Sequence, residues 1–182
     1  GFYRVRYEAG LLSELHARLA DLDPLERFTL LDDTWAFTVE GSVPVDEFAG
    51  LAAAFRDETE HAVWQMLSTH LLELGRYVPN DEHYAAYIRE LVGPTVERVG
   101  WEPEEDEADL TRRLRGQVLT TYGRLGMDEA TITKAQDLFH TVVADPSAVD
   151  AEVALAVLAI GAANGGEDEY DAVVKAYEAN TN

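Results

Sequence analysis

Apolar residues recur at helical spacing along most of this sequence, and this pattern restricts the chain to folds built from helices. Between residues 24 and 40, for example, the apolar positions fall three or four apart, as one face of an α-helix requires. These positions are Leu25, Phe28, Leu31, Trp35 and Val39. Asp23 and Pro24 form a typical helix start, and Gly41 is a typical helix stop. We therefore predict a helix over 24–40.

The same spacing is found in further segments along the chain. They lie at 11–19, 48–55, 63–74, 84–99, 110–125, 132–142, 151–163 and 170–177. Gly93 and Pro94 fall inside one of them and should kink or break that helix, because proline lacks the amide that a helix interior needs. The segment 151–163 is apolar on almost every side, which indicates a helix that is buried all round. The sequence thus predicts about nine helices of ordinary globular length.

The short connections between these helices make sequential helices antiparallel neighbours. Helical hairpins that repeat every ~35 to 45 residues favour an α-solenoid of the HEAT or armadillo type. The repeat is structural only, because no residue-level consensus such as the tetratricopeptide pattern is present. We expect an all-α fold of stacked hairpins, with a compact helical bundle as the alternative packing.

The first eight residues, GFYRVRYE, show a different period. Their side chains alternate, with Tyr3, Val5 and Tyr7 on one face and Phe2, Arg4 and Arg6 on the other. A period of two predicts a β-strand, but nearly everything after it predicts helix. We therefore divide the chain into a terminal strand at 1–9, which belongs to a β domain upstream, and a helical domain at 10–182.

Charge and cysteine content exclude several classes of function. The chain carries 35 acidic against 14 basic residues, a net charge of −21, which repels nucleic acid and disfavours anionic membranes. No apolar run is long enough to predict a transmembrane helix. Cysteine is absent, which excludes disulfides and thiolate metal sites and fits a reducing compartment, so we expect a cytoplasmic protein.

The sequence contains no recognisable catalytic constellation. None of its five histidines lies in an H-E-x-x-H arrangement, and it has no G-x-S-x-G, P-loop or G-x-G-x-x-G motif. His61 follows Glu58 and Glu60, but this cluster is more typical of a solvated helix start than of a metal site. We expect no catalytic, metal-binding or cofactor-binding residue in this chain.

Asp32 and Asp33 are the most suggestive acids. Paired carboxylates can serve acid–base chemistry when they share a site. Adjacent residues of a helix project about 100° apart, however, so these two do not face each other. We expect one of them to pair with an arginine where two helices meet, since buried acids are usually paired. Trp35, Trp64 and Trp101 are expected to be core or interface anchors.

Four segments together resemble the C-terminal helical domain of zinc aminopeptidases of the aminopeptidase N family, the type also found in endoplasmic-reticulum aminopeptidases. GFYRVRYE at 1–8 is similar to the family's G-Y-Y-R-V-N-Y-D, and RFTLLDDTWAF at 27–37 to its R-x-x-L-L-D-D-x-F. ETEHAVW at 58–64 is similar to E-x-x-Y-x-x-W, and NGGEDEYDAV at 164–173 to G-G-x-E-E-W-D. The order and spacing of these segments match across essentially the whole chain.

This resemblance implies a role without catalysis. The family's zinc-binding H-E-x-x-H and substrate-gripping G-x-M-E-N segments are absent here, so zinc and the reaction are expected in other domains of a parent aminopeptidase. In that family the helical domain covers the catalytic cleft and limits which peptides enter. The expected partners are the upstream catalytic and β-sandwich domains and the peptide substrate. The matching segments supply the candidate structural or interdomain contact residues, which are Arg4, Arg27, Asp32, Asp33, Glu58 and Trp64.

The resemblance also implies that the helical domain is longer than 10–182, so that an internal face is exposed where this sequence stops. We expect self-association through that face or through the terminal strand. Two other readings stay open on the residues alone. One is a free-standing α-solenoid that binds peptides or proteins, and the other is an independent all-helical enzyme.

Overall fold

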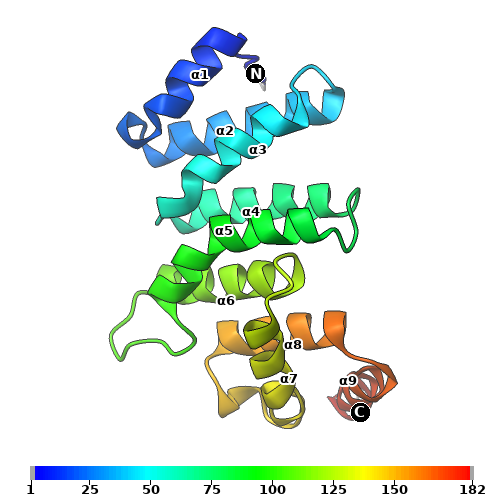
Figure 1. Cartoon of the computed structure of the whole chain (residues 1–182). Helices are drawn as coiled ribbons and strands as arrows, with labels where there is room; N and C mark the ends of the chain where they lie inside the picture. The colour runs from blue at the N-terminus through cyan, green and yellow to red at the C-terminus, as the bar shows by residue number, and fades with distance from the viewer. Residues whose placement is uncertain (1–2, 181–182) are drawn as a thin grey trace. The chain divides into compact units, whose positions relative to one another are not determined.

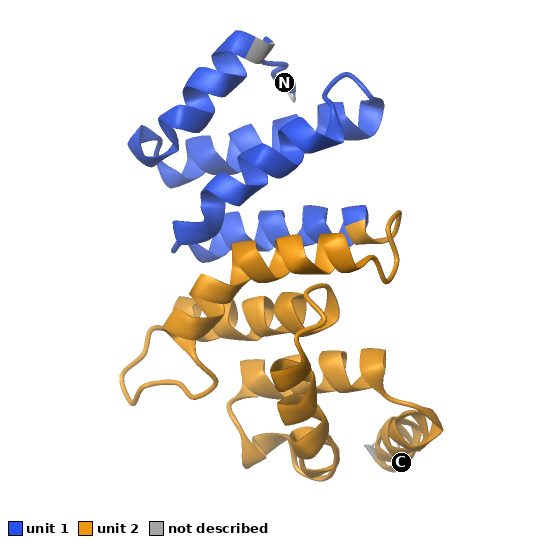
Figure 2. Cartoon of the chain, in the orientation of Figure 1, with its two compact units in different colours: residues 1–74 blue, residues 75–182 orange. Residues whose placement is uncertain are grey.

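The computed structural model describes residues 3–180, and every regular element in that range is a helix, in agreement with an all-α fold. The chain forms two compact units, residues 1–74 and 75–182, which are described separately (Figure 2). No helix in the described range is both long and apolar enough to cross a membrane.

Unit 1 contains four α-helices and two short 3₁₀ turns (Figure 1). The helices are α1 (Ala9–Ala17), α2 (Pro24–Glu40), α3 (Val45–Ala53) and α4 (His61–Gly75), the last of which ends at the first residue of unit 2. The 3₁₀ turns are η1 (Leu19–Asp21) and η2 (Ala54–Asp57). The most deeply buried apolar side chains of this unit come from α2, α3, η2 and α4. They include Leu31, Phe48, Leu51, Phe55, Val63, Trp64, Leu67 and Leu71.

The boundaries of α2 follow the signals in the sequence. The Asp23 carboxylate accepts a hydrogen bond from the amide of Glu26 at 2.8 Å, and the Glu26 carboxylate accepts one from the amide of Asp23 at 2.8 Å. This capping box satisfies amides that the first turn of a helix leaves free. Gly41 ends the helix in the left-handed conformation, at φ 90°.

The buried face of α2 only partly coincides with the predicted stripe. Leu31 and Trp35 are buried as expected, but Leu25 and Val39 are 72% and 64% exposed. Polar residues occupy part of the buried face instead, including Asp33, Thr34 and Thr38. The hydroxyls of both threonines donate to carbonyls one turn back in α2, which satisfies them without a partner from another element.

The strand expected at the N-terminus is not formed by the described residues. Residues 3–8 precede α1 and belong to neither a helix nor a strand, while residues 1 and 2 lie outside the described range. A strand requires a neighbouring strand for its backbone hydrogen bonds. The Val5 amide instead donates to the side chain of Asp33 on α2.

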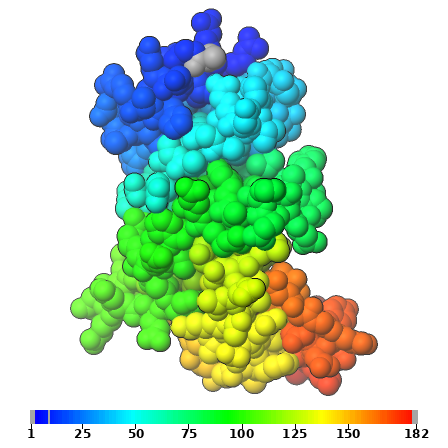
Figure 3. All heavy atoms as spheres, in the orientation of Figure 1, coloured from blue at the N-terminus to red at the C-terminus, as the bar shows by residue number. Residues whose placement is uncertain are grey.

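Unit 2 contains five α-helices and one 3₁₀ turn. They are α5 (Glu82–Val99), α6 (Asp109–Arg124), α7 (Glu129–Ala144), η3 (Pro146–Ala148), α8 (Ala151–Asn164) and α9 (Glu167–Asn180). Successive helices pack on each other from α5 to α9, and alternate helices also pack, α6 on α8 and α7 on α9 (Figure 1). In the space-filling view α9 lies at the edge of this unit, beside α7 and α8 (Figure 3).

Two expectations for unit 2 are wrong in part. The helix at 84–99 does not break at Pro94, because α5 continues through it to Val99. Val92, Gly93 and Thr95 are buried around the proline, and this packing outweighs the hydrogen bond that the helix loses there, since tertiary context overrides local propensity.

The helix at 151–163 is not buried all round. Val157 and Ile160 of α8 are fully buried, whereas Leu155 is 63% exposed, because α6 and α7 cover only part of the helix circumference. The buried part is closely packed. A β-carbon added to Gly116 of α6 would lie 2.5 Å from the carbonyl oxygen of Glu152, so glycine permits the close approach of α6 and α8.

Candidate functional site

All six residues expected to make structural or interdomain contacts lie in unit 1, where they form two clusters. We call the first cluster the N-terminal clamp, which consists of Arg4, Val5, Asp32 and Asp33. We call the second the Arg27 cluster, which consists of Arg27, Glu58 and Trp64. Both join elements that are distant in the sequence.

In the N-terminal clamp, the two adjacent aspartates of α2 hold two adjacent residues of the N-terminal segment. Arg4 Nη1 donates to Asp32 Oδ2 at 2.7 Å and to the Asp32 carbonyl at 3.0 Å. The Val5 amide donates to Asp33 Oδ2 at 3.0 Å. Arg4 Nη1 also lies 3.7 Å from Asp33 Oδ1, so the one guanidinium faces both carboxylates.

The source of the arginine differs from the expectation. Arg4 comes from the extended segment before α1, whereas the sequence had suggested an arginine at a contact between two helices. Asp33 is buried and Asp32 is half-buried, so the clamp is only partly shielded from water. Partial shielding strengthens the charge-assisted hydrogen bonds relative to those of a fully exposed pair.

The aspartate side of the clamp also contacts a buried histidine, His70 of α4, which sequence reasoning missed. His70 Nε2 lies 3.4 Å from Asp32 Oδ1, and His70 Nδ1 lies 3.9 Å from Glu73 Oε2. The ring stacks on Trp35 at 5.2 Å between centroids, and the Trp35 indole donates to the same Glu73 oxygen at 2.7 Å. A signal was available, because His70 falls three residues after Leu67 on the apolar stripe of α4.

Burial controls the charge of His70. Its side chain is only 6% exposed, and neither ring nitrogen makes a hydrogen bond of good geometry. Loss of solvation lowers the pKa of His70 below its usual 6.5, although Asp32 and Glu73 favour the charged ring and oppose this effect. His70 is therefore neutral at pH 7.

The Arg27 cluster joins the first turn of α2 to the segment that precedes α4. Arg27 Nε and Nη2 donate to the two carboxylate oxygens of Glu58 at 2.6 and 3.1 Å, and Arg27 Nη1 donates to the Leu22 carbonyl at 2.6 Å. The indole of Trp64, which is fully buried, donates to the Glu58 carbonyl at 2.9 Å. Glu58 thus binds α2 through its side chain and α4 through its backbone.

Glu58 is stabilised as an anion. The amides of Thr59 and Glu60 donate to its Oε1 at 2.8 and 2.9 Å, in addition to the two bonds from Arg27. Burial alone raises the pKa of Glu58, but the hydrogen bonds from Arg27, Glu60 and Thr59 outweigh burial and lower it below the usual value. The same pair raises the pKa of Arg27, so both groups keep their charge over the physiological range.

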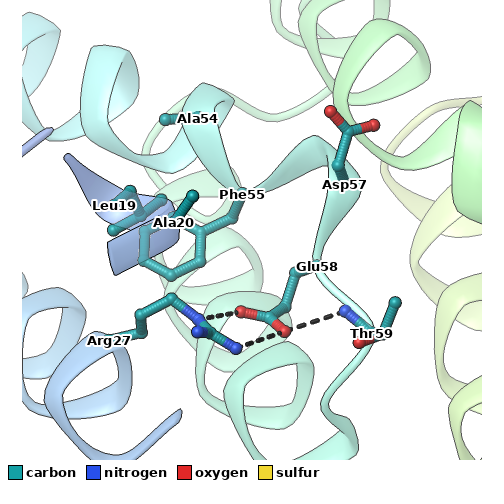
Figure 4. Close-up of a pocket in the computed structure, with 8 residues that line it drawn as sticks. All are labelled: Leu19, Ala20, Arg27, Ala54, Phe55, Asp57, Glu58 and Thr59. Atoms are coloured by element: carbon teal, nitrogen blue, oxygen red, sulfur yellow. Dashed lines mark hydrogen bonds and ion pairs between the residues drawn. The ribbon is translucent and has the colours of Figure 1, made fainter. Parts of the chain in front are cut away.

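A cavity of about 280 Å³ lies beside this cluster (Figure 4). Its walls are partly apolar, from Leu19, Ala54 and Phe55, and its polar edge comes from Arg27 and Glu58. Figure 4 shows the guanidinium and the carboxylate directed at each other. The charges of Arg27 and Glu58 neutralise each other at this edge of the cavity.

The described residues include no group of three or more histidine, aspartate or glutamate side chains that could hold a metal ion. His61, Glu58 and Glu60 therefore do not form a ligand set. Arg4, Arg18 and Arg27 of unit 1 each bind a carboxylate of the same unit.

A buried ion pair in unit 2 was not expected from the sequence. Arg115 of α6 is almost fully buried, and its Nη2 donates to the Val99 carbonyl at 2.7 Å and to Glu107 Oε1 at 2.6 Å. This pair attaches the acidic loop before α6 to the C-terminal end of α5. The hydrogen bonds from Arg115 lower the pKa of Glu107.

Comparison with known proteins gives matches to a family model and to several curated proteins. A family model described as the ERAP1-like C-terminal domain matches residues 1–182. The chain is 32% identical to Aminopeptidase M1-A of Oryza sativa subsp. japonica over 152 residues, which cover 80% of this chain and 17% of that protein. It is 26% identical to the puromycin-sensitive aminopeptidase of Caenorhabditis elegans over 188 residues, covering 100% of this chain and 20% of that protein.

A second plant protein, Aminopeptidase M1 of Arabidopsis thaliana, is 29% identical over 153 residues, which cover 80% of this chain and 17% of the relative. The chain thus spans 17 to 20% of the length of these curated relatives.

Proposed function

This chain belongs to the ERAP1-like C-terminal domain family, and on that basis we propose that it is the non-catalytic C-terminal domain of a zinc aminopeptidase, where it covers the catalytic cleft and limits which peptides enter. The observation that carries the proposal is the family match over residues 1–182. The curated relatives are named as aminopeptidases and are several times longer than this chain. A larger polypeptide therefore has room for a separate catalytic centre.

In this proposal, other domains of the parent polypeptide bind the zinc ion and carry out hydrolysis. The described residues contain no set of side chains that fits a zinc ion. The partners proposed for this domain are accordingly the catalytic and β-sandwich domains of the same polypeptide and the peptide that they process. A cytoplasmic location is part of the proposal and is compatible with the absence of cysteine.

The helix arrangement in unit 2 supports a covering role. The packing of α6 on α8 and of α7 on α9, together with the packing of successive helices, is the pattern of stacked helical hairpins. Stacked hairpins form extended walls, and a wall over an active site excludes water and orders the bound substrate. We extend this arrangement to an α-solenoid of the HEAT type for the domain as a whole.

Charge gives the proposed wall a further effect on substrates. The chain has a net charge of −21, so it attracts the cationic amino terminus of a peptide over a distance comparable to the Debye length. The kcat/KM of the parent enzyme for short cationic peptides should fall as ionic strength rises. An unchanged kcat/KM between low and high salt contradicts this electrostatic contribution.

The direct test of the proposal compares the parent enzyme with a variant that lacks residues 10–182. The intact enzyme should discriminate between peptides of different length, and the shortened enzyme should retain zinc and cleave small aminoacyl substrates with little length preference. Equal length preference in the two enzymes contradicts the covering role. The 182-residue chain alone should bind no zinc and release no amino acid, which serves as the control.

A further inference from the structure

The arrangement of His70 between two carboxylates has no role in the proposed function and has its own chemical consequence. Asp32 faces Nε2 at 3.4 Å from α2, and Glu73 faces Nδ1 at 3.9 Å from within α4. A neutral imidazole carries one N–H, so it can donate to only one of these two acceptors. The other ring nitrogen then presents a lone pair to a carboxylate, which is unfavourable.

A second proton on the ring removes this conflict, because an imidazolium donates from both nitrogens. Burial opposes the second proton, and at neutral pH burial prevails. The ring therefore acquires its charge only on acidification. The charged ring is then attracted most strongly to Asp32, the carboxylate nearer to the ring.

Asp32 is shared between His70 and the N-terminal clamp. Its Oδ2 accepts from Arg4 at 2.7 Å while its Oδ1 faces His70, so one carboxylate lies between two cations once the ring is charged. Arg4 also lies 3.7 Å from Asp33 Oδ1, the other carboxylate of the clamp. The two cations also repel each other across Asp32, and Arg4 is one of the groups that disfavours a charged His70. Phe48 of α3, which carries no charge, also packs on the ring.

We propose that His70 is a proton-sensitive release for the N-terminal clamp: when its ring gains a second proton, Asp32 turns toward His70 and the attachment of residues 3–8 to α2 loosens. This device is built from contacts within unit 1 alone. It does not depend on the proposed function of the domain.

A pH titration of the full 182-residue chain, followed by NMR, tests the proposal. Two signals are monitored between pH 8 and pH 5, the imidazole ring of His70 and the backbone amide of Val5, which binds Asp33. We expect both to change with one midpoint below pH 6.5. The hydrogen-exchange protection of the Val5 amide, corrected for intrinsic rates, should fall about tenfold across that step. A Val5 amide signal that does not change at the pH where the His70 ring titrates overturns the proposal.

Two variants separate the release from other effects of pH. In Asp32→Asn the ring still titrates but no longer shares a carboxylate with Arg4, so the Val5 amide should stop following it. In His70→Gln the step at Val5 should be absent. His83→Gln, which removes an exposed histidine of unit 2, is the matched control. In this variant the Val5 amide signal should change with pH as it does in the wild type. Persistence of the step in Asp32→Asn refutes the proposal even if His70→Gln does not fold.

Discussion

Arg27 and Glu58 lie 31 positions apart and are joined by two hydrogen bonds between guanidinium and carboxylate, at 2.6 and 3.1 Å. The pair is largely screened from water, with side-chain exposures of 17% and 3%. Glu58 also accepts two backbone amides, so it fixes the chain before α4 as well as the first turn of α2. A buried pair of this kind is costly to break from one side, because the remaining charge stays buried without its partner.

Glu58→Gln should lower the free energy of unfolding by about 3 kcal/mol, the usual cost of removing one partner of a buried pair. Equilibrium urea denaturation measures this change. Glu60→Gln, an exposed neighbour, is the matched control and should change the free energy by less than about 0.5 kcal/mol. A double variant with Arg27→Met should be less destabilised than the sum of the single variants. Additive effects contradict the direct coupling of Arg27 and Glu58.

Acid should weaken the fold through Glu58 over a defined range. Its pKa is lower in the folded chain than the ordinary value of 4.5, so its contribution is complete above pH 4.5 and is lost as pH falls through the lower folded value. In Glu58→Gln the free energy of unfolding should therefore depend less on pH in this range than in the wild type. Thermal unfolding at a series of pH values measures the difference. Parallel pH curves for the two proteins show that the prediction is wrong.

His70 should add a second, earlier loss of stability. The folded state resists the proton that the unfolded chain accepts at its ordinary pKa of 6.5, so the free energy of unfolding declines as pH falls below 6.5 and stops declining below the folded pKa. The decline between pH 6.5 and pH 5 should be smaller in His70→Gln than in the wild type. His83→Gln again provides the control. A steeper decline in His70→Gln than in the wild type shows that the pKa of His70 is not lowered by folding.

Arg115→Met should detach the acidic loop between α5 and α6. The substitution removes hydrogen bonds to Val99 and Glu107 and leaves that carboxylate without its cation, which should cost about 3 kcal/mol. Amide exchange in 101–108 should accelerate more than exchange in α7. Arg113→Met, at a side chain that is 60% exposed, is the control and should leave this loop unchanged. Uniform acceleration across unit 2 indicates general destabilisation in place of local release.

Gly116→Ala should destabilise unit 2 by about 1 to 3 kcal/mol, because its methyl group would collide with the backbone of α8 at Glu152. Gly50→Ala is the control, because Gly50 also lies within a helix but a β-carbon there meets nothing within 4 Å. Alanine has the higher helix propensity, so Gly50→Ala should be neutral or stabilising by up to about 1 kcal/mol. Chemical denaturation of both variants gives the two values. Equal effects at the two sites show that the α6–α8 contact does not select glycine.

The helices were predictable because their signals are local. The capping box at Asp23 and the stop at Gly41 set the limits of α2 through contacts within a few residues. The predicted burial pattern was less accurate, since exposure depends on which neighbours cover a helix. Leu155 illustrates this limit, because its apolar sequence context indicated burial and its position in the packed unit leaves it exposed.

The contact residues were identified by resemblance, and their pairings were not. Nothing in the spacing of Arg4 and Asp32 shows that they meet, since the chain between them must first fold back through α1. The contact of His70 with Asp32 was hidden for the same reason, as the two residues lie on different helices. Self-association through an exposed face stays a prediction, which light scattering at several protein concentrations would check.

One detail of the N-terminal clamp has an evolutionary consequence. The Asp33 carboxylate accepts a hydrogen bond from the backbone amide of Val5, and the side chain of Val5 takes no part in that bond. Natural variation at position 5 should accordingly be broad in size and polarity, with proline as the substitution that selection removes, because it alone has no hydrogen on its backbone nitrogen.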